Sequence, residues 1–179
     1  MPVTDCVRHG DVGSKGPPSV ASRAGDRVAA LSVQLAQAHQ ELRRQIGEIR
    51  AGLGRRGSGS ALSTHCLAFC EALTSHHQGE DEGMFSALLR ERPDLAATVA
   101  NLVEDHGMIA SILSRVRVLA DRAADSPESA AEPIGRELDG LAAIMESHFG
   151  YEERTISDAL DHGVSDTGWS ETVFRFGAG

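Results

Sequence analysis

Apolar residues recur at intervals of three and four along most of the chain, with polar residues between them. This spacing places the apolar side chains on one face of a helix and therefore predicts amphipathic helices rather than strands. Three segments rich in glycine, proline or polar residues separate the helices: residues 54–60, the break at Pro93, and a stretch with Pro127 and Pro133. The predicted helices span residues 26–53, 61–90, 94–120 and 134–159.

The apolar stripe of the second predicted helix ends in two polar residues. Its steps of four and three, from Leu62 to Leu73, lead on to His76 and then Glu80. An imidazole and a carboxylate in core positions are costly to bury unless something pairs with them. Because the two residues lie one helical turn apart, a single metal ion can contact both. The alternative is a polar helix end that enters solvent at the acidic run 80–82.

The other three predicted helices also have polar residues in core positions of their apolar stripes. His39 and His106 occupy core positions of the first and third helices, and His148 and Glu152 occupy consecutive core positions of the fourth. Four helices with short connections predict an all-α, antiparallel up-down-up-down bundle. In such a bundle, residues equally distant from a turn lie at one height. Measured from loop centres near residues 57, 92 and 126, all four histidines lie at about one level and face inward.

Composition supports a helical domain and excludes polyanionic partners. The chain has 179 residues, 41% of them hydrophobic and only 4% aromatic, which suits one helical core. A net charge of −9 argues against nucleic acid or an anionic membrane surface as partner. No apolar run approaches the length of a membrane span, and residues 1–20 lack the apolar region of a secretion signal. The odd number of cysteines suits reduced thiols, so we expect a cytoplasmic protein.

The chain divides into three parts on this pattern. Residues 1–21 contain Gly, Pro and Ser without periodicity and are predicted to form an irregular N-terminal arm. Residues 22–161 are predicted to form the bundle. Residues 162–179 are predicted to form a C-terminal tail that packs Trp169, Phe174 and Phe176 against the bundle.

The inward-facing polar residues form a set with the chemistry of a metal site. Imidazole combined with carboxylate suits iron, manganese or zinc, whereas soft metals prefer thiolates. Two carboxylates are enough to bridge a pair of metal ions, and four histidines then divide as two per ion. The predicted ligands are His39, His76, Glu80, His106, His148 and Glu152.

Four segments within residues 26–160, AHQELRRQI, HHQGEDEGMF, EDHGMI and HFGYEE, resemble the hemerythrin-like (HHE cation-binding) family. The ligand pattern is closest to that of the actinobacterial hemerythrin-like proteins. The resemblance implies a non-haem di-iron centre, oxo- or hydroxo-bridged when oxidised, that reacts with dioxygen, peroxide or nitric oxide. It also implies that His39, His76, His106 and His148 are terminal ligands and that Glu80 and Glu152 are the bridges.

One position departs from the oxygen-carrying members of that family. The carriers have a second histidine one turn after the ligand of the third helix, where this chain has Ala110. A missing ligand leaves a position on one iron for water or substrate. This favours an oxidoreductase that turns over peroxide or nitric oxide, with an electron donor as a further partner. The alternative is an oxygen-binding, oxygen-sensing or iron-storage protein without turnover.

A second register of the second helix would place His77 and Asp81 inside. The unbroken stripe from Leu62 favours His76 with Glu80, which leaves His77, Asp81 and Glu153 at the surface or in contact with the ligands, where they would orient them. His65 is about three turns from His76 and is expected to be too distant to take part.

The cysteines are given no role at the metal site. Cys66 and Cys70 lie near the apolar stripe and are expected to be small core residues. Cys6 and His9, three apart in the N-terminal arm, have no further ligands near them in the sequence.

Overall fold

The computed structural model describes residues 29–53, 59–123 and 127–175, and every regular element within these ranges is helical. The N-terminal arm, Asp26, Phe176 and the pair Cys6 and His9 lie outside the described residues. The elements are α1 (Leu31–Gly52), α2 (Gly59–Gly79), the π-helix η1 (Glu80–Met84), α3 (Phe85–Glu91), the 3-10 helix η2 (Pro93–Leu95), α4 (Ala96–Ala123), α5 (Pro127–His162) and α6 (Ser170–Phe174).

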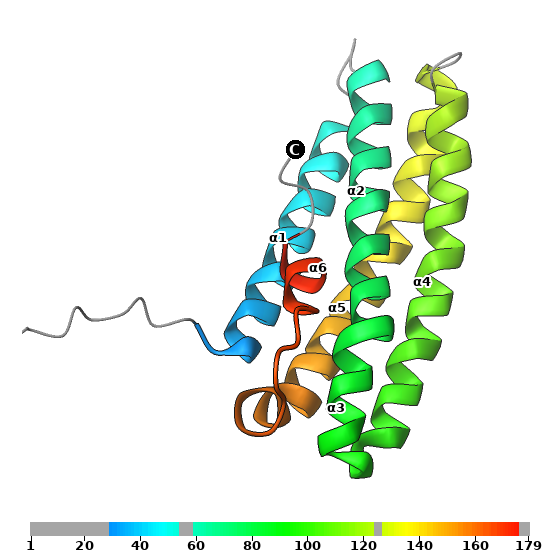
Figure 1. Ribbon diagram of the computed structural model, residues 1–179. Coiled ribbons are helices and arrows are strands. Elements are labelled where there is room, and N and C mark those ends of the chain that lie inside the picture. Colours follow the sequence, from blue (N-terminus) through cyan, green and yellow to red (C-terminus); the bar gives the residue numbers. More distant parts are fainter. Residues whose placement is uncertain (1–28, 54–58, 124–126, 176–179) are drawn as a thin grey trace, which may run out of the picture.

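Four long helical segments run alternately up and down (Figure 1). Helices α2, η1 and α3 follow one another without a break and together form the second segment, as the pattern up to Arg90 predicted. Each segment packs against two others, α1 against α2 and α5, and α4 against α2 and α5. The predicted four-helix bundle is therefore confirmed. Among the described residues no helix is long and apolar enough to cross a membrane.

The buried apolar residues form two clusters, one above and one below a polar layer. Along α1, Leu35 belongs to one cluster and Leu42 to the other, with His39 between them. Along α4, Leu102 and Ile109 flank His106 in the same way. The polar layer therefore lies inside the bundle at one level, which is where the heptad-like steps of the sequence placed the histidines.

The two thiols of the described residues lie in the larger apolar cluster. Cys66 and Cys70 are both fully buried and make no disulfide. Burial, with the neighbouring Cys70, raises the pKa of the Cys66 thiol to about 12, and burial raises the pKa of Cys70 to about 11. Both are therefore neutral thiols that pack as small apolar groups, as the stripe predicted.

The segment after α5 returns along the bundle and packs against α2 and α1 through α6 (Figure 1). Trp169 and Val173 are buried there, in the cluster that also contains Phe85. Two glycines permit this close approach. A Cβ at Gly83 would lie 2.5 Å from Cβ of Trp169, and a Cβ at Gly79 would lie 3.0 Å from Cγ2 of Thr172.

Candidate metal centre

All six residues singled out in the sequence lie in the polar layer and are buried, none more than 4% exposed. They come from all four long segments: His39 from α1, His76 and Glu80 from α2 and η1, His106 from α4, and His148 and Glu152 from α5. The structure therefore brings the whole set together in the interior of the bundle.

Each of the four histidines has its Nδ1 atom held by an acceptor on the outer side of the layer. His39 donates to Glu153 and His106 donates to Asp81, both over 2.8 Å. A hydrogen bond from Nδ1 fixes the tautomer in which Nε2 carries the lone pair. The remaining two acceptors are the backbone carbonyl of Val173 for His76, at 2.8 Å, and the carboxylate of Asp105 for His148, at 3.3 Å.

The Nε2 atoms face the two buried carboxylates. Oε1 of Glu80 lies 3.1 Å from Nε2 of His76, and Oε2 of Glu80 lies 3.4 Å from Nε2 of His106. The two oxygens of one carboxylate thus face histidines on different helices. Oε2 of Glu152 lies 3.3 Å from Nε2 of His39 and 3.8 Å from Nε2 of His148. Both carboxylates therefore lie between two pairs of histidines, His39 with His76 on one side of the layer and His106 with His148 on the other.

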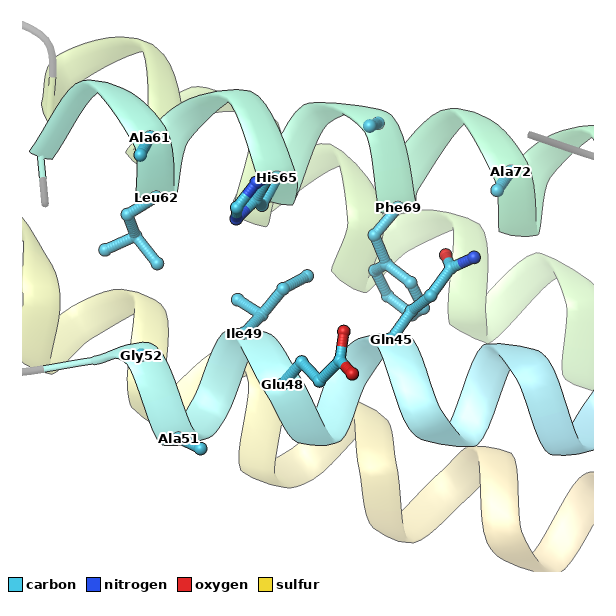
Figure 2. A pocket seen from close by; sticks show the side chains of 11 residues that line it. Gln45, Glu48, Ile49, Ala51, Gly52, Ala61, Leu62, His65, Phe69 and Ala72 are labelled. Atoms are coloured by element: carbon cyan, nitrogen blue, oxygen red, sulfur yellow. The ribbon is translucent and has the colours of Figure 1, made fainter. Parts of the chain in front are cut away.

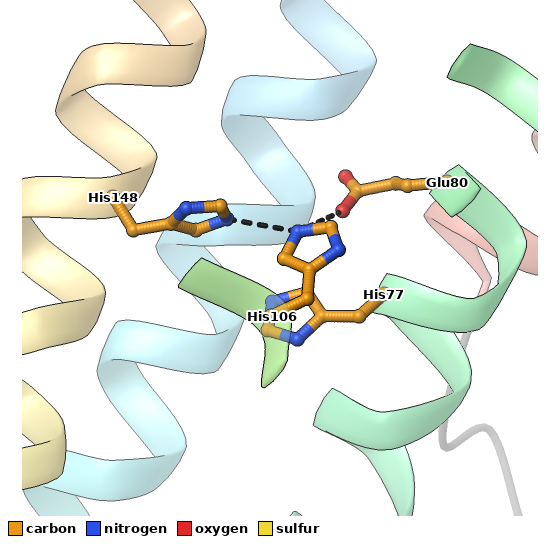
Figure 3. A group of neighbouring side chains, drawn as sticks. All are labelled: His77, Glu80, His106 and His148. Carbon is orange, nitrogen blue, oxygen red and sulfur yellow. Dashed lines mark hydrogen bonds and ion pairs between the residues drawn. The ribbon is translucent and has the colours of Figure 1, made fainter. Parts of the chain in front are cut away.

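The spacing on the His106–His148 side matches that of two ligands on one ion. Their Nε2 atoms are 3.1 Å apart (Figure 3). Two ligands at right angles, each about 2.1 Å from a metal, would be about 3 Å apart. His106 and His148 are therefore already spaced as neighbouring ligands.

His77 lies inside the polar layer and not at the surface. His77 is 5% exposed, and its ring stacks on that of His106, with centroids 4.0 Å apart and an angle of 9° between the planes (Figure 3). One ligand atom from each of His77, Glu80, His106 and His148 lies within 4.8 Å of the others. A second such group comprises His39, His76 and Glu80. Of the two placements expected for His77, the surface is therefore wrong, whereas contact with a ligand candidate is what the structure shows.

The structure buries the histidines of both registers of the second helix, His76 and His77, but of the two acidic residues it buries Glu80 and leaves Asp81 partly exposed. Helix α2 packs against α1 on one side and α4 on the other. Its buried face is therefore wide enough for adjacent residues, which lie about 100° apart around a helix. The pairs Phe69–Cys70 and Ala72–Leu73 are both buried in the same way. This doubled apolar pattern was the signal in the sequence that His77 faces inward.

Two carboxylates contact the histidine candidates of α1 and α4, as the sequence predicted. Asp81 and Glu153 contact Nδ1 of His106 and His39 and so orient these rings. Arg43 donates to the same Glu153 oxygen over 3.2 Å, which ties this carboxylate to α1 at a second point. His65 is exposed and belongs to neither ligand group.

Ala110 does not mark a gap in the site. The side chain one turn after His106 on α4 is exposed, whereas Ile109 is fully buried. The predicted open position beside Ala110 is therefore not supported, because that residue points away from the polar layer. On the side of His106 that lies towards α2, the neighbouring ring is His77.

The sequence model of the hemerythrin HHE cation-binding domain matches residues 31–160. The chain belongs to this family. A search of curated proteins and a search of solved structures found no match to the chain. Family membership and the two buried ligand groups together show a metal-binding helical protein.

The polar atoms of this hemerythrin-family site fit a bound cation. Both oxygens of Glu80 and both oxygens of Glu152 are buried and make no hydrogen bond within the described part of the chain. The same is true of Nε2 of His39 and His77. Buried polar atoms are normally paired, and leaving one unpaired costs about 1–3 kcal/mol. Metal ions between the carboxylates and imidazoles would satisfy these atoms.

Burial also sets the protonation of these groups. Burial lowers the pKa of His76 and of His77 well below 6.5, so both rings are neutral at pH 7, the form that binds metal. Burial opposes protonation of His39, but the neighbouring Glu152 and Glu153 outweigh it and raise its pKa. Burial, with the charge of Glu152, raises the pKa of Glu80 well above 4.5. A cation at the centre would favour the ionised carboxylate.

A separate groove of about 560 Å³ lies between α1 and α2 (Figure 2). Its lining includes Ile49, Leu62, His65 and Phe69. None of the six predicted ligands lines it, so the groove belongs to the surface of the larger apolar cluster and not to the metal centre.

Proposed function

We propose that this hemerythrin-family chain binds two iron ions side by side in the polar layer. His39 and His76 would hold one ion, and His106 and His148 the other. Glu80 and Glu152 would each bridge the two ions. The observation that carries this proposal is the position of Glu80, whose two oxygens lie 3.1 Å from Nε2 of His76 and 3.4 Å from Nε2 of His106.

Several features favour iron among the metals of this class. The donors are imidazole nitrogens and carboxylate oxygens, which suit iron, manganese and zinc. The thiols Cys66 and Cys70 lie in the apolar cluster and not in the polar layer. Family membership adds weight to iron.

We propose further that the loaded protein is an oxidoreductase that reacts with a small oxidant: hydrogen peroxide, nitric oxide or dioxygen. A pair of iron ions supplies reversible electron transfer to such a molecule. Disproportionation of hydrogen peroxide balances without another reductant, since two molecules give two of water and one of dioxygen. Oxidation of nitric oxide would require a second substrate, such as dioxygen, to accept its electrons. Peroxide is therefore the first substrate to test.

Reversible binding of dioxygen is a second candidate, and His77 favours it. The oxygen carriers have one histidine more than the six predicted ligands provide, and the structure buries a fifth imidazole in the layer. A histidine-rich site with fewer open positions would favour holding dioxygen over converting it. Oxygen sensing and iron storage remain alternatives without turnover.

Metal content tests the first part of the proposal. After expression with excess iron, elemental analysis of the purified chain should give about two irons per chain. Glu80→Ala should lose the pair because it removes a bridge, whereas His65→Ala, at an exposed histidine of the same long helical segment, should keep it. One metal or none per wild-type chain would contradict the paired site.

Reactivity tests the second part. The iron-loaded protein would be reduced without air and then mixed with dioxygen, hydrogen peroxide or nitric oxide while its absorption spectrum is recorded. Catalytic consumption of peroxide or nitric oxide supports the oxidoreductase. A long-lived dioxygen adduct that reverses under vacuum, with no consumption of the other two, supports the carrier and overturns the oxidoreductase.

A further inference from the structure

One imidazole in the polar layer has no role in the six-residue site. The His77 side chain is buried, and its Nε2 atom makes no hydrogen bond within the described residues. A buried ring nitrogen without a partner costs about 1–3 kcal/mol. The surrounding rings are those of His76, His106 and His148, with centroids 5.5, 4.0 and 5.4 Å away. His77 is thus enclosed by other metal-ligand candidates.

The distances around His77 fit a single ion. Ligand atoms of His77, Glu80, His106 and His148 all lie within 4.8 Å of one another. Two ligands on opposite sides of an ion, with bonds of about 2.1 Å, would lie about 4.2 Å apart. The four donors therefore lie close enough together to reach one ion once the His77 ring, now within 9° of parallel to that of His106, tilts out of the stack. Figure 3 shows the side chains arriving there from α2, η1, α4 and α5.

We propose that His77 is a third imidazole ligand of the ion held by His106, His148 and Glu80. This inference rests on the proposed function, because it requires two metal ions in the layer. Within the described part of the chain, the group His39, His76 and Glu80, which would hold the other ion, has no equivalent third ring. The two metal positions are therefore unequal, one with three imidazoles and the other with two.

This inequality specifies where an oxidant binds. The ion with three imidazoles and shared carboxylates is close to full coordination. The ion between His39 and His76 keeps the open position. A small oxidant therefore binds at the His39–His76 ion alone. The extra ligand comes from the helix that supplies His76, and not from α4, where the corresponding position, Ala110, is exposed.

The alternative is that His77 only packs against His106. His77→Phe separates the two roles, because phenylalanine keeps an aromatic ring in the stack but has no ligand atom. His77→Gln keeps a polar side chain of similar length without an imidazole. His65→Ala is the matched control, since it removes an exposed histidine from the same helix.

The first measurement is release of iron from the loaded full-length protein to a ferrous chelator without air. Wild type and His65→Ala should hold both ions. His77→Phe and His77→Gln should hold one ion as wild type does and bind the other at least about 10-fold more weakly, the lower end of the loss seen when a residue behind a ligand is removed. Wild-type retention of both ions in both variants overturns the proposal.

The second measurement is the Mössbauer spectrum of the oxidised iron-loaded protein. Unequal positions predict two doublets of equal area in wild type. His77→Phe should make the two irons more alike and bring the doublets together. An unchanged spectrum overturns the proposal even where His77→Phe is less stable to heat, because stability does not alter the ligands of iron that remains bound.

The failures of the two proposals are distinguishable. Fewer than two irons per wild-type chain contradicts the proposed function. Two irons per wild-type chain with an unaltered His77→Phe protein contradicts only the role of His77.

Discussion

Nδ1 of His76 donates a hydrogen bond of 2.8 Å to the backbone carbonyl of Val173, 97 residues further along the chain. His76 is the only one of the four predicted histidine ligands whose outer partner, within the described residues, is a backbone atom. The contact depends on the segment after α5, which Trp169 anchors against Gly83. The position of one metal-ligand candidate therefore depends on a segment outside the four long helices.

Removing α6 should weaken metal binding on the His39–His76 side. A chain that ends at Gly168 lacks the Val173 carbonyl, so the ring of His76 loses the contact that orients it. We expect iron affinity at one position to fall by about 10–100-fold, measured by competition with a chelator. A chain that ends at Arg175 keeps every described contact of α6 and is the control. Equal retention by both chains would contradict this role of the segment.

Neutralising the carboxylates behind the ligands should have a similar effect. Asp81→Asn and Glu153→Gln remove the charge that holds Nδ1 of His106 and His39. Each should lower metal affinity by about 10–100-fold, measured in the same competition. Glu82→Gln makes the same change of charge at an exposed neighbour and should have no effect. If Glu82→Gln weakens binding as much, the loss is one of net charge and not of orientation.

Gly83→Ala should destabilise the fold, whereas Gly47→Ala should stabilise it. A Cβ at Gly83 would meet Cβ of Trp169 at 2.5 Å and would displace the C-terminal segment, at a cost of about 1–3 kcal/mol. A Cβ at Gly47 meets nothing within 4 Å, so alanine there should gain up to about 1 kcal/mol from helix propensity. Chemical denaturation of both variants measures these free energies of unfolding. An unchanged free energy of unfolding for Gly83→Ala would show that the C-terminal segment moves aside at little cost.

The free energy of unfolding of the metal-free protein should fall as the pH drops below 6.5. Burial holds the pKa of His77 well below 6.5 in the folded protein, whereas the unfolded chain takes up a proton near 6.5. Lower pH therefore favours the unfolded state through this residue. Glu80, with a raised pKa, acts in the opposite sense above 4.5.

Comparison with His77→Phe isolates the contribution of one histidine. Below pH 6.5 the slope for wild type should exceed that for His77→Phe by up to about 1.4 kcal/mol per pH unit, the value for one proton. Denaturant titrations at several pH values measure both slopes. Parallel curves would mean that His77 gains its proton in the folded state as easily as in the unfolded chain.

Ala110→His should leave the metal centre unchanged. Because Ala110 is exposed, an imidazole there would extend into solvent and not into the polar layer. Iron content and the absorption spectrum should match those of wild type. A change in either would show that this face of α4 does approach the metal.

Much of this arrangement follows from the order of residues along the chain. Steps of three and four place His39 and His106 on the same helical faces as Leu35 and Leu102, and burial of those faces carries the histidines inside. Antiparallel packing of neighbouring helices then brings the rings to one level, because each helix rises by the same amount per residue. The bundle and the convergence of the six polar residues rest on these local regularities.

Three features are decided only by the tertiary structure. His77 is buried because α2 contacts two neighbouring helices. The apolar pattern of a single helix does not specify how many other helices will pack against that helix. Ala110 is exposed because the rotation of α4 is fixed by the residues that its neighbours bury. The contact between Val173 and His76 joins segments far apart in sequence, and no local pattern encodes such a pairing. Helix periodicity is a local property, whereas the width of a buried face and the path of the C-terminal segment depend on what packs against them.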